Sequence, residues 1–161
     1  MIHFEKKCCL PAQLAERVAT LRRPLVMTNG VFDLLHRGHV SYLAQAAELG
    51  ASLVVAVNSD ASARRLRKGP GRPVNCCEDR MALLAALAST HLVTRFSEDT
   101  AERVLSVVRP DIYVKGGDYD VQATAEGRAA KAYGAQVISI DVMHVRSTSA
   151  IIHQIRRMGT R

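Results

Sequence analysis

Aromatic side chains are scarce in this sequence, which has no Trp and only 4% aromatic residues. The scarcity argues against a nucleic-acid module that stacks bases on aromatic rings, and we find no zinc-finger pattern. Apolar residues, including Cys, make up 48% of the chain and are mainly Ala, Val, Leu and Ile. Such a composition suits buried parallel strands that are covered by Ala-rich helices. We therefore expect an α/β protein that binds no nucleic acid.

Cysteine is also rare and occurs in two adjacent pairs, Cys8–Cys9 and Cys76–Cys77. Neither pair has the C-x-x-C spacing of a zinc or redox site, so we expect unpaired thiols in a reducing cytosol. No apolar run approaches the roughly 20 residues of a membrane span. Residues 1–6 lack the apolar core of a secretion signal. These absences predict a cytoplasmic protein that has no membrane partner.

Positive charge is in excess: 22 Lys and Arg face 15 Asp and Glu, which gives a formal charge of +7. The resulting field attracts anions such as phosphates, acidic lipids or nucleic acid. A solvated surface is an equally good explanation for many of these side chains. The 161 residues fit one ordinary domain, residues 1–161, since domains usually have roughly 100 to 200 residues.

Strands and helices alternate along the whole chain. Short apolar runs predict strands at 25–29, 52–57, 92–94, 111–114 and 136–140. Helical spacing and end signals predict helices at 11–22, 38–49, 60–66, 78–88, 100–108, 122–133 and 148–157. Because the connections are short, we expect right-handed crossovers and a Rossmann-like fold, a mainly parallel five-stranded sheet with helices on both faces. The first helix, about 11–23, is expected as an appendage, and Gly50 as a left-handed helix cap.

Three connections follow strands at the edge where such a sheet binds ligands. In open α/β sheets this edge lies beyond the carboxyl ends of the strands, where the strand order reverses. The connections are residues 30–39, 115–119 and 146–149, and they contain the polar, Gly-rich and charged stretches of the sequence. We expect the site there.

The first of these connections carries two histidines, His36 and His39, at the start of a helix. Backbone amides at a helix start bind anions, and two imidazoles at this spacing can donate hydrogen bonds to one phosphoryl group. The turn is not the G-x-G-x-x-G of dinucleotide-binding proteins. A structural His pair remains an open alternative. We expect no metal bound by the protein, because no third zinc ligand stands at a suitable spacing.

Residues 30–39 resemble the signature of the cytidylyltransferase-like nucleotidyltransferases. The matching pattern is Gly30-x-Phe32-Asp33-x-x-His36-x-Gly38-His39. Within that superfamily, segments 27–30, 58–60, 68–74, 78–80 and 114–119 resemble the heptose 1-phosphate adenylyltransferases, and the resemblance extends from about residue 12 to 157. It fits the free-standing enzymes or the C-terminal half of the bifunctional kinase/adenylyltransferases, and the length favours the free-standing form.

The resemblance implies an activity. Such an enzyme transfers the AMP moiety of ATP, bound with Mg²⁺, to D-glycero-β-D-manno-heptose 1-phosphate and gives ADP-heptose and pyrophosphate for the lipopolysaccharide core. It also implies a homodimer or a higher homo-oligomer. Two alternatives stay open from the residues: a CTP-dependent cytidylyltransferase acting on glycerol 3-phosphate or another polyol phosphate, and a non-catalytic nucleotide or nucleic-acid binding protein.

The resemblance also implies roles for individual residues. His36, His39 and Lys68 are expected to act on the phosphates in the transition state, with Lys68 reaching in from the basic loop 68–73. The residues expected at the nucleotide are Thr28, Asn29, Gly30, Phe32, Gly38, Arg80, Arg146, Ser147, Thr148 and Ser149. Those expected at the sugar phosphate are Asp33, Arg72, Lys115, Gly117 and Asp118.

Some of these roles have simpler alternatives. The loop 68–73 could be a solvated basic segment, and Arg80 could form a helix-surface ion pair with Glu78 or Asp79, which would contribute little. Ser147 could simply cap the last helix. Members of the family generally have Ser-Thr-Thr where this chain has residues 147–149, Ser-Thr-Ser. Ser149 keeps the hydroxyl of Thr and lacks only its methyl group, so we expect this difference to affect packing more than function.

Overall fold

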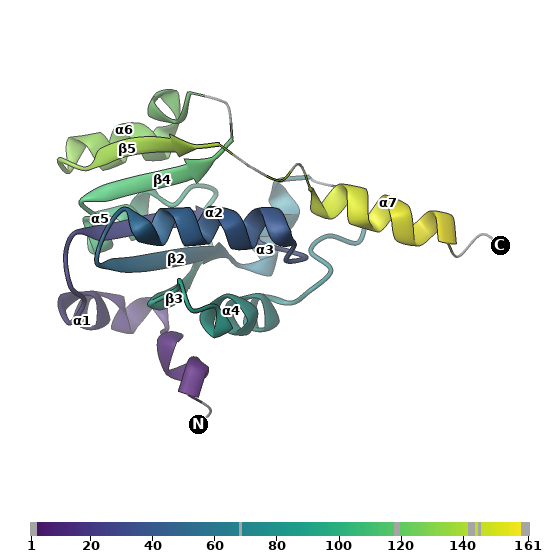
Figure 1. Cartoon of the computed structure of the whole chain (residues 1–161), viewed down its shortest axis with the longest axis horizontal. Coiled ribbons are helices and arrows are strands. Elements are labelled where there is room, and N and C mark those ends of the chain that lie inside the picture. Colours follow the sequence, from purple (N-terminus) through teal and green to yellow (C-terminus); the bar gives the residue numbers. More distant parts are fainter. Residues whose placement is uncertain (1–2, 68, 118–119, 142–143, 145, 159–161) are drawn as a thin grey trace.

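The computed structural model describes residues 3–67, 69–117, 120–141, 144 and 146–158 (Figure 1). Five parallel strands form one sheet with the order β3-β2-β1-β4-β5. The strands are β1 (Leu25–Gly30), β2 (Ser52–Asn58), β3 (Leu92–Phe96), β4 (Ile112–Gly116) and β5 (Gln136–Ile140). The predicted Rossmann-like sheet is confirmed, and every strand pair in it is parallel.

Helices connect the strands and cover both faces of the sheet. They are α1 (Leu14–Ala19), α2 (Arg37–Glu48), α3 (Asp60–Arg65), α4 (Cys77–Ala86), α5 (Glu102–Val108), α6 (Ala125–Ala132) and α7 (Thr148–Met158). Three short 3-10 turns, η1 (His3–Lys7), η2 (Pro11–Gln13) and η3 (Val121–Ala123), complete the described elements. In Figure 1, α7 extends away from the sheet and its covering helices. None of the helices in the described ranges has the length and apolar character needed to cross a bilayer.

The core has two parts because successive strand residues point to opposite faces of the sheet. Met27 and Val54 pack on one face, together with residues of α1, α5 and α6. Val26 and Val55 pack on the other face, with residues of α2 and α4. The interior strand β2, between β3 and β1, is buried along its whole length, as its continuous apolar run predicts.

Two local expectations differ from the structure. The helix expected as an appendage packs into the core by Leu14, which is 2% exposed, and it divides into η2 and a shorter α1. Gly50 is not in the left-handed region. A side chain is excluded there for a different reason, because a Cβ atom would meet the Pro24 carbonyl oxygen at 2.5 Å.

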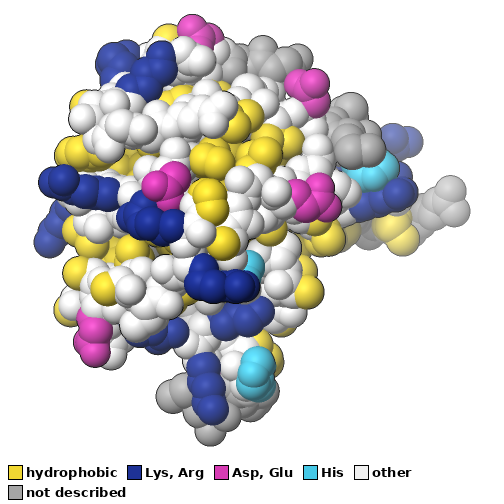
Figure 2. Space-filling model, turned by 60° about the vertical axis from the view of Figure 1, so that its left-hand side comes forward, with side chains coloured by type: hydrophobic (Ala, Val, Ile, Leu, Met, Phe, Trp, Pro, Cys, Tyr) yellow, Lys and Arg dark blue, Asp and Glu magenta, His cyan; other side chains and the backbone are white. Residues whose placement is uncertain are grey.

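Positive side chains are spread over the surface rather than gathered, at least on the face that Figure 2 shows. On this face, Lys and Arg are interspersed with apolar patches and with single Asp and Glu side chains. This distribution agrees with the solvated-surface explanation for much of the positive charge.

Candidate active site

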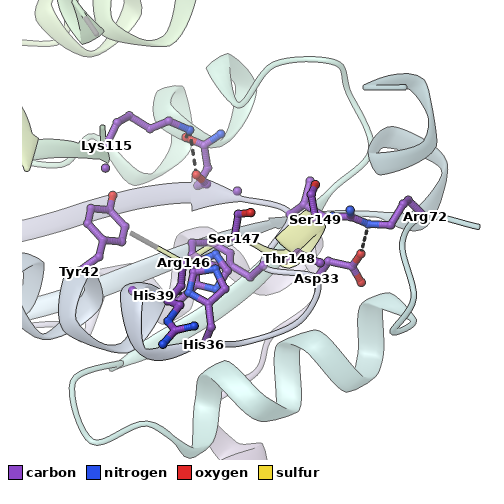
Figure 3. Close-up of a pocket in the computed structure, with 16 residues that line it drawn as sticks. Asp33, His36, His39, Tyr42, Arg72, Lys115, Arg146, Ser147, Thr148 and Ser149 are labelled. Atoms are coloured by element: carbon purple, nitrogen blue, oxygen red, sulfur yellow. Dashed lines mark hydrogen bonds and ion pairs between the residues drawn. The ribbon is translucent and has the colours of Figure 1, made fainter. Parts of the chain in front are cut away.

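A cavity of about 360 Å³ lies at the carboxyl ends of β1 and β4, where the strand order reverses (Figure 3). The three connections expected from the sequence meet there. The lining residues are Asn29, Gly30, Val31, Phe32, Asp33, His36, Gly38, His39, Tyr42, Arg72, Lys115, Gly116, Arg146, Ser147, Thr148 and Ser149. Three of the charged side chains are cations and Asp33 is the one carboxylate among these described lining residues, so the cavity favours an anionic ligand.

The two histidines lie against each other at the start of α2. His36 is the N-cap residue, and its Nδ1 accepts a hydrogen bond of 3.4 Å from the backbone N–H of His39. The two rings stack with their centroids 3.8 Å apart, and the rings of Phe32 and His39 form a T-shaped pair with centroids 5.4 Å apart. The structure thus brings both imidazoles together on one side of the cavity.

The protonation of His36 follows from its surroundings. Burial lowers the pKa of the His36 imidazole below its ordinary value, because desolvation penalises the charged form. Since Nδ1 acts as an acceptor, the proton of the neutral ring belongs on Nε2. At neutral pH, His36 can therefore donate from Nε2 to a ligand oxygen.

Gly38 allows the chain to pass close to this pair. A Cβ atom at Gly38 would lie 2.9 Å from the carbonyl oxygen of His144 and 3.0 Å from Nδ1 of His36. The absence of a side chain thus brings the segment before α7 against the first turn of α2. Gly38 was expected at the nucleotide; it lines the cavity, and its close neighbours are the His144 backbone and the His36 ring.

The ends of β1 and β4 are joined by a polar cluster beside the cavity. Lys115 Nζ donates to the backbone oxygen of Asn29 at 2.9 Å, and the Tyr113 hydroxyl donates to Asn29 Oδ1 at 2.6 Å. On the face of the sheet where Tyr42 packs, opposite to that of Tyr113, the hydroxyl groups of Thr28 and Tyr42 are 2.6 Å apart. Thr28 is 1% exposed and does not line the cavity, so its contact holds Tyr42 in place.

Asp33 is occupied by protein groups. Its side chain is 1% exposed and forms an ion pair of 2.5 Å with Nε of Arg72. Its other carboxylate oxygen accepts hydrogen bonds from the backbone N–H groups of Val74 and Asn75 at 2.7 and 3.1 Å. These contacts anchor residues 72–75. Asp33 also lines the cavity, and its contact with the sugar phosphate stays a prediction. Arg72 itself lines the cavity, as expected.

Arg80 also differs from its expected place. Its side chain is 0% exposed and does not line the cavity. Neither Glu78 nor Asp79 is its partner: Nη2 pairs with Asp60 Oδ1 at 2.6 Å, whereas Glu78 pairs with Arg95. Both explanations offered from the sequence assumed an accessible guanidinium, and helix α4 instead directs it into the protein.

The start of α7 forms another part of the cavity wall. Ser147 caps the helix, since its hydroxyl accepts from the backbone N–H of Ala150 at 3.1 Å. The hydroxyl of Thr148 contacts the carbonyl oxygen of Leu34, which links α7 to the His-bearing turn. Arg146 and Ser149 are exposed and line the cavity. Capping of α7 by Ser147 is compatible with anion binding, because the Ser147 hydroxyl engages one backbone amide and leaves the other amides at the start of the helix available.

The remaining site residues divide into three groups. Gly30 and Gly116 line the cavity, while Gly117 follows β4 with φ +130° and does not line it. Lys68 and Asp118 lie outside the described residues. Tyr42 lines the cavity but was not predicted. Its place in α2, three residues after His39, was the signal that could have identified it.

Residues 27–156 match the model of a protein family described as cytidylyltransferase-like. The chain therefore belongs to this family, which the fold and the paired histidines had already indicated.

Two relatives are similar to this chain over most of its length. The D-beta-D-heptose 1-phosphate adenylyltransferase of Bordetella bronchiseptica is 53% identical over 156 residues, which cover 96% of both chains. The bifunctional protein HldE of Pseudomonas paraeruginosa is 50% identical over 84% of this chain, which corresponds to 28% of that longer protein.

Solved structures agree with the fold. A lipopolysaccharide core biosynthesis protein from Thermoplasma volcanium superimposes with a TM-score of 0.63 at 30% identity, and the match covers 76% of this chain and 98% of that one. A pantothenate synthetase from Thermus thermophilus superimposes with a TM-score of 0.57 at 18% identity and covers 86% of this chain and 62% of its own. The second likeness concerns the fold alone.

Proposed function

We propose that this chain transfers the adenylyl group of ATP to D-glycero-β-D-manno-heptose 1-phosphate and releases pyrophosphate, in the formation of ADP-heptose for the lipopolysaccharide core. The observation that carries the proposal is the stacked pair His36 and His39 at the start of α2, inside a cavity lined by Lys115, Arg72 and Arg146. The 53% identity to a heptose 1-phosphate adenylyltransferase supports the choice of substrates.

The reaction is an in-line substitution at the α-phosphorus of ATP. A phosphate oxygen of the sugar 1-phosphate forms the new P–O bond while the bond to the pyrophosphate oxygen breaks. The nucleophile is already an anion, so positioning and charge stabilisation matter more than removal of a proton. His36 and His39 donate hydrogen bonds to the α-phosphate oxygens, where negative charge builds up. No covalent intermediate with the protein is needed.

Cations around the cavity hold the remaining phosphates. Lys115 stands at the carboxyl end of β4 and Arg146 just before α7, and both line the cavity together with the histidines. The amides at the start of α7 favour the β- and γ-phosphates or the released pyrophosphate. Arg72 extends this positive surface toward the sugar phosphate. Lys68, from the same basic loop of the sequence, is expected to act on the phosphates as well.

Mg²⁺ enters with ATP in this proposal and neutralises part of the triphosphate charge. The donor set of the cavity fits an ion that is held mainly by phosphate oxygens and water, as Mg²⁺ often is. Among the described residues no group of three or more His, Cys, Asp or Glu could hold a metal, and both carboxylate oxygens of Asp33 are engaged by protein groups.

The substrates are tested by measuring pyrophosphate release with each nucleoside triphosphate and heptose 1-phosphate. We expect release with ATP. Preference for CTP, or for glycerol 3-phosphate as acceptor, would contradict the proposal and favour a cytidylyltransferase. No release with any pair, despite tight ATP binding, would favour a non-catalytic nucleotide-binding protein.

The role of His39 is tested by the variant His39→Ala. Loss of one donor to transition-state charge typically lowers kcat about 10²- to 10³-fold, while we expect the Kd for ATP to change less than tenfold, as an order of magnitude. His3→Ala serves as the control, because His3 is exposed in η1 and outside the cavity. Unchanged turnover in His39→Ala would remove this residue from the mechanism.

We also propose a cytoplasmic homodimer. ATP is a cytoplasmic substrate, and the four cysteines are unpaired, which suits a reducing compartment. On α7, Ile155 and Met158 are 59% and 70% exposed, and such apolar side chains on a projecting helix suit contact with another protein surface. Light scattering should give twice the 17.6 kDa of the chain. A monomer mass at all concentrations would contradict the dimer.

A further inference from the structure

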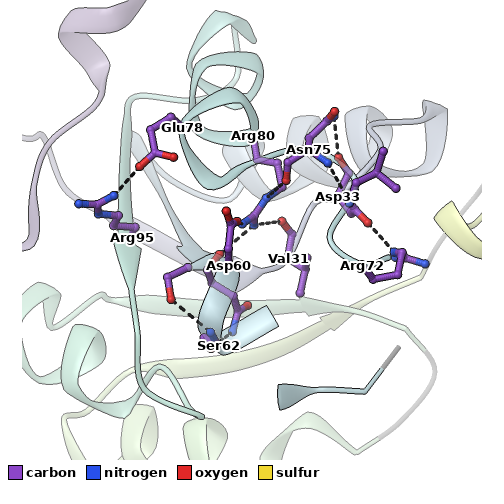
Figure 4. A network of polar contacts seen from close by, with 12 residues as sticks. Val31, Asp33, Asp60, Ser62, Arg72, Asn75, Glu78, Arg80 and Arg95 are labelled. Carbon is purple, nitrogen blue, oxygen red and sulfur yellow. Dashed lines mark hydrogen bonds and ion pairs between the residues drawn. The ribbon is translucent and has the colours of Figure 1, made fainter. Parts of the chain in front are cut away.

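Arg80 has an unusual set of partners for a side chain that lies next to an active site. Figure 4 shows its guanidinium among three backbone segments. The hydrogen-bond partners are the carbonyl oxygens of Asn75 (3.0 Å), Val31 (2.7 Å) and Asn58 (2.8 Å), and the ion-pair partner is Asp60 (2.6 Å). A surface ion pair would need only the last of these contacts.

The three carbonyl groups come from connections that are distant in the sequence. Val31 belongs to the turn that leaves β1 and leads to the paired histidines, and Asn58 ends β2. Asn75 comes three residues after Arg72, one of the cations that line the cavity. A single planar guanidinium therefore fixes the turn with the histidines relative to the segment with Arg72.

A second group of contacts joins the same two segments. Asp33 binds Arg72 and the amides of Val74 and Asn75, and Asn75 Nδ2 donates to the backbone oxygen of Asp33 at 3.1 Å. Residues 72–75 are thus held against residues 31–33 from two sides, by Asp33 and by Arg80 (Figure 4).

We propose that Arg80 is a positioning residue for the transfer reaction and acts through Arg72. Its bonds to the carbonyl groups of Val31 and Asn75 set the position of the Arg72 guanidinium relative to the two imidazoles. The inference rests on the proposed function, in which these groups bind the reacting phosphates. Arginine is required because its rigid fork reaches several acceptors at fixed angles, whereas a lysine ammonium on a flexible stem cannot reproduce that geometry.

A kinetic double-mutant cycle tests this role with Arg80→Lys and Arg72→Ala. Misplacement of a reacting group by about 1 Å can cost on the order of 10²-fold in rate, and we expect a loss of that order in Arg80→Lys. The loss should appear as a lower kcat and a higher KM for the sugar phosphate, while the KM for ATP stays nearly constant. A purely structural role would reduce the amount of active enzyme, which lowers kcat and leaves both KM values unchanged.

The double-mutant cycle then tests whether Arg80 acts through Arg72. Residues that act through one another have non-additive effects. We therefore expect Arg80→Lys to cause only a small further loss once Arg72 is Ala. Full additivity of the two losses would overturn the inference. If Arg80→Lys does not fold, Asp60→Asn takes its place, because it removes the charge that pairs with the Arg80 guanidinium at 2.6 Å, and the same non-additivity with Arg72→Ala is expected.

The matched control is Arg95→Lys. Arg95 also forms an ion pair of 2.6 Å with a carboxylate, Glu78, but its side chain is 38% exposed and lies outside the cavity. We expect its kcat and both KM values to match the wild type. The wild type is measured first with ATP and heptose 1-phosphate: failure to release pyrophosphate contradicts the proposed function, whereas a normal wild type with additive losses contradicts only the role of Arg80.

Discussion

Replacing Asp33 by Ala should destabilise the protein strongly, because its carboxylate is the buried anchor of residues 72–75. The side chains of Asp33 and Arg72 are 1% and 11% exposed. Without the carboxylate, the guanidinium loses its ion pair and the amides of Val74 and Asn75 lose their acceptor. Removal of one partner from a buried ion pair costs about 3 to 5 kcal/mol, a large part of the roughly 5 to 15 kcal/mol that stabilises a typical domain.

The expected change is measurable as a melting temperature. For a chain of this size, each kcal/mol lowers Tm by about 2 to 4 °C, so Asp33→Ala should lose roughly 6 to 20 °C by this estimate. Asp33→Asn keeps an oxygen for the two amides and should lose less. The loss of the charged contact to Arg72 alone costs about 1.5 to 3 kcal/mol.

The surface pair of Arg65 and Asp99 provides the control for this experiment. Its atoms are also 2.5 Å apart, but its side chains are 48% and 74% exposed, and exposed pairs contribute about 0 to 1 kcal/mol. Thermal unfolding monitored by circular dichroism should rank the losses as Asp33→Ala, then Asp33→Asn, then Asp99→Ala. If Asp33→Ala were as mild as Asp99→Ala, the argument that Asp33 anchors residues 72–75 would be refuted.

Three further predictions concern the surroundings of the histidines and the cysteines. Because burial lowers the pKa of His36 in the folded state, the unfolded chain binds more protons below about pH 6.5. Stability should therefore fall as the pH drops from 7 toward the folded pKa of His36. In the variant His36→Gln, Tm should decrease less steeply with falling pH than in the wild type. Equal slopes of Tm against pH in the two proteins would contradict the lowered pKa of His36. Gly38→Ala should lower Tm, since its Cβ would meet the His144 oxygen at 2.9 Å and overpacking costs about 1 to 3 kcal/mol; an unchanged Tm would argue against this packing. Burial raises the pKa of the Cys77 thiol to about 11, so mass spectrometry after brief alkylation at pH 8 should find the exposed Cys76 modified and Cys77 protected, and equal labelling would contradict the burial of Cys77.

Local patterns were sufficient for the fold and for the centre of the site. The apolar run of β2 and the alternation of elements predicted the parallel sheet, because both depend on neighbouring residues in the sequence. The position of His36 and His39 followed from the same logic, since a turn after a buried strand must emerge at the ligand-binding edge of the sheet. The observed helix α2, Arg37–Glu48, differs from the predicted helix 38–49 by one residue at each end.

Contacts between distant segments could not be predicted in this way. Nothing in the sequence around Arg80 distinguishes a helix-surface arginine from a buried one, since its partners are carbonyl groups that the fold brings together from residues 31, 58 and 75. Asp33 likewise has a partner at Arg72, 39 residues away. The burial of Leu14 depends on the packing of α1 beside α5, which only the tertiary structure determines.

The central claim is that the turn after β1 binds a triphosphate with its α-phosphate at the paired imidazoles. A crystal structure with a non-hydrolysable ATP analogue and Mg²⁺ tests this most directly. The account predicts α-phosphate oxygens within about 3 Å of ring nitrogens of His36 and His39, the range of a hydrogen bond. A triphosphate bound elsewhere, with both rings still packed against protein atoms and not touching it, would contradict the account.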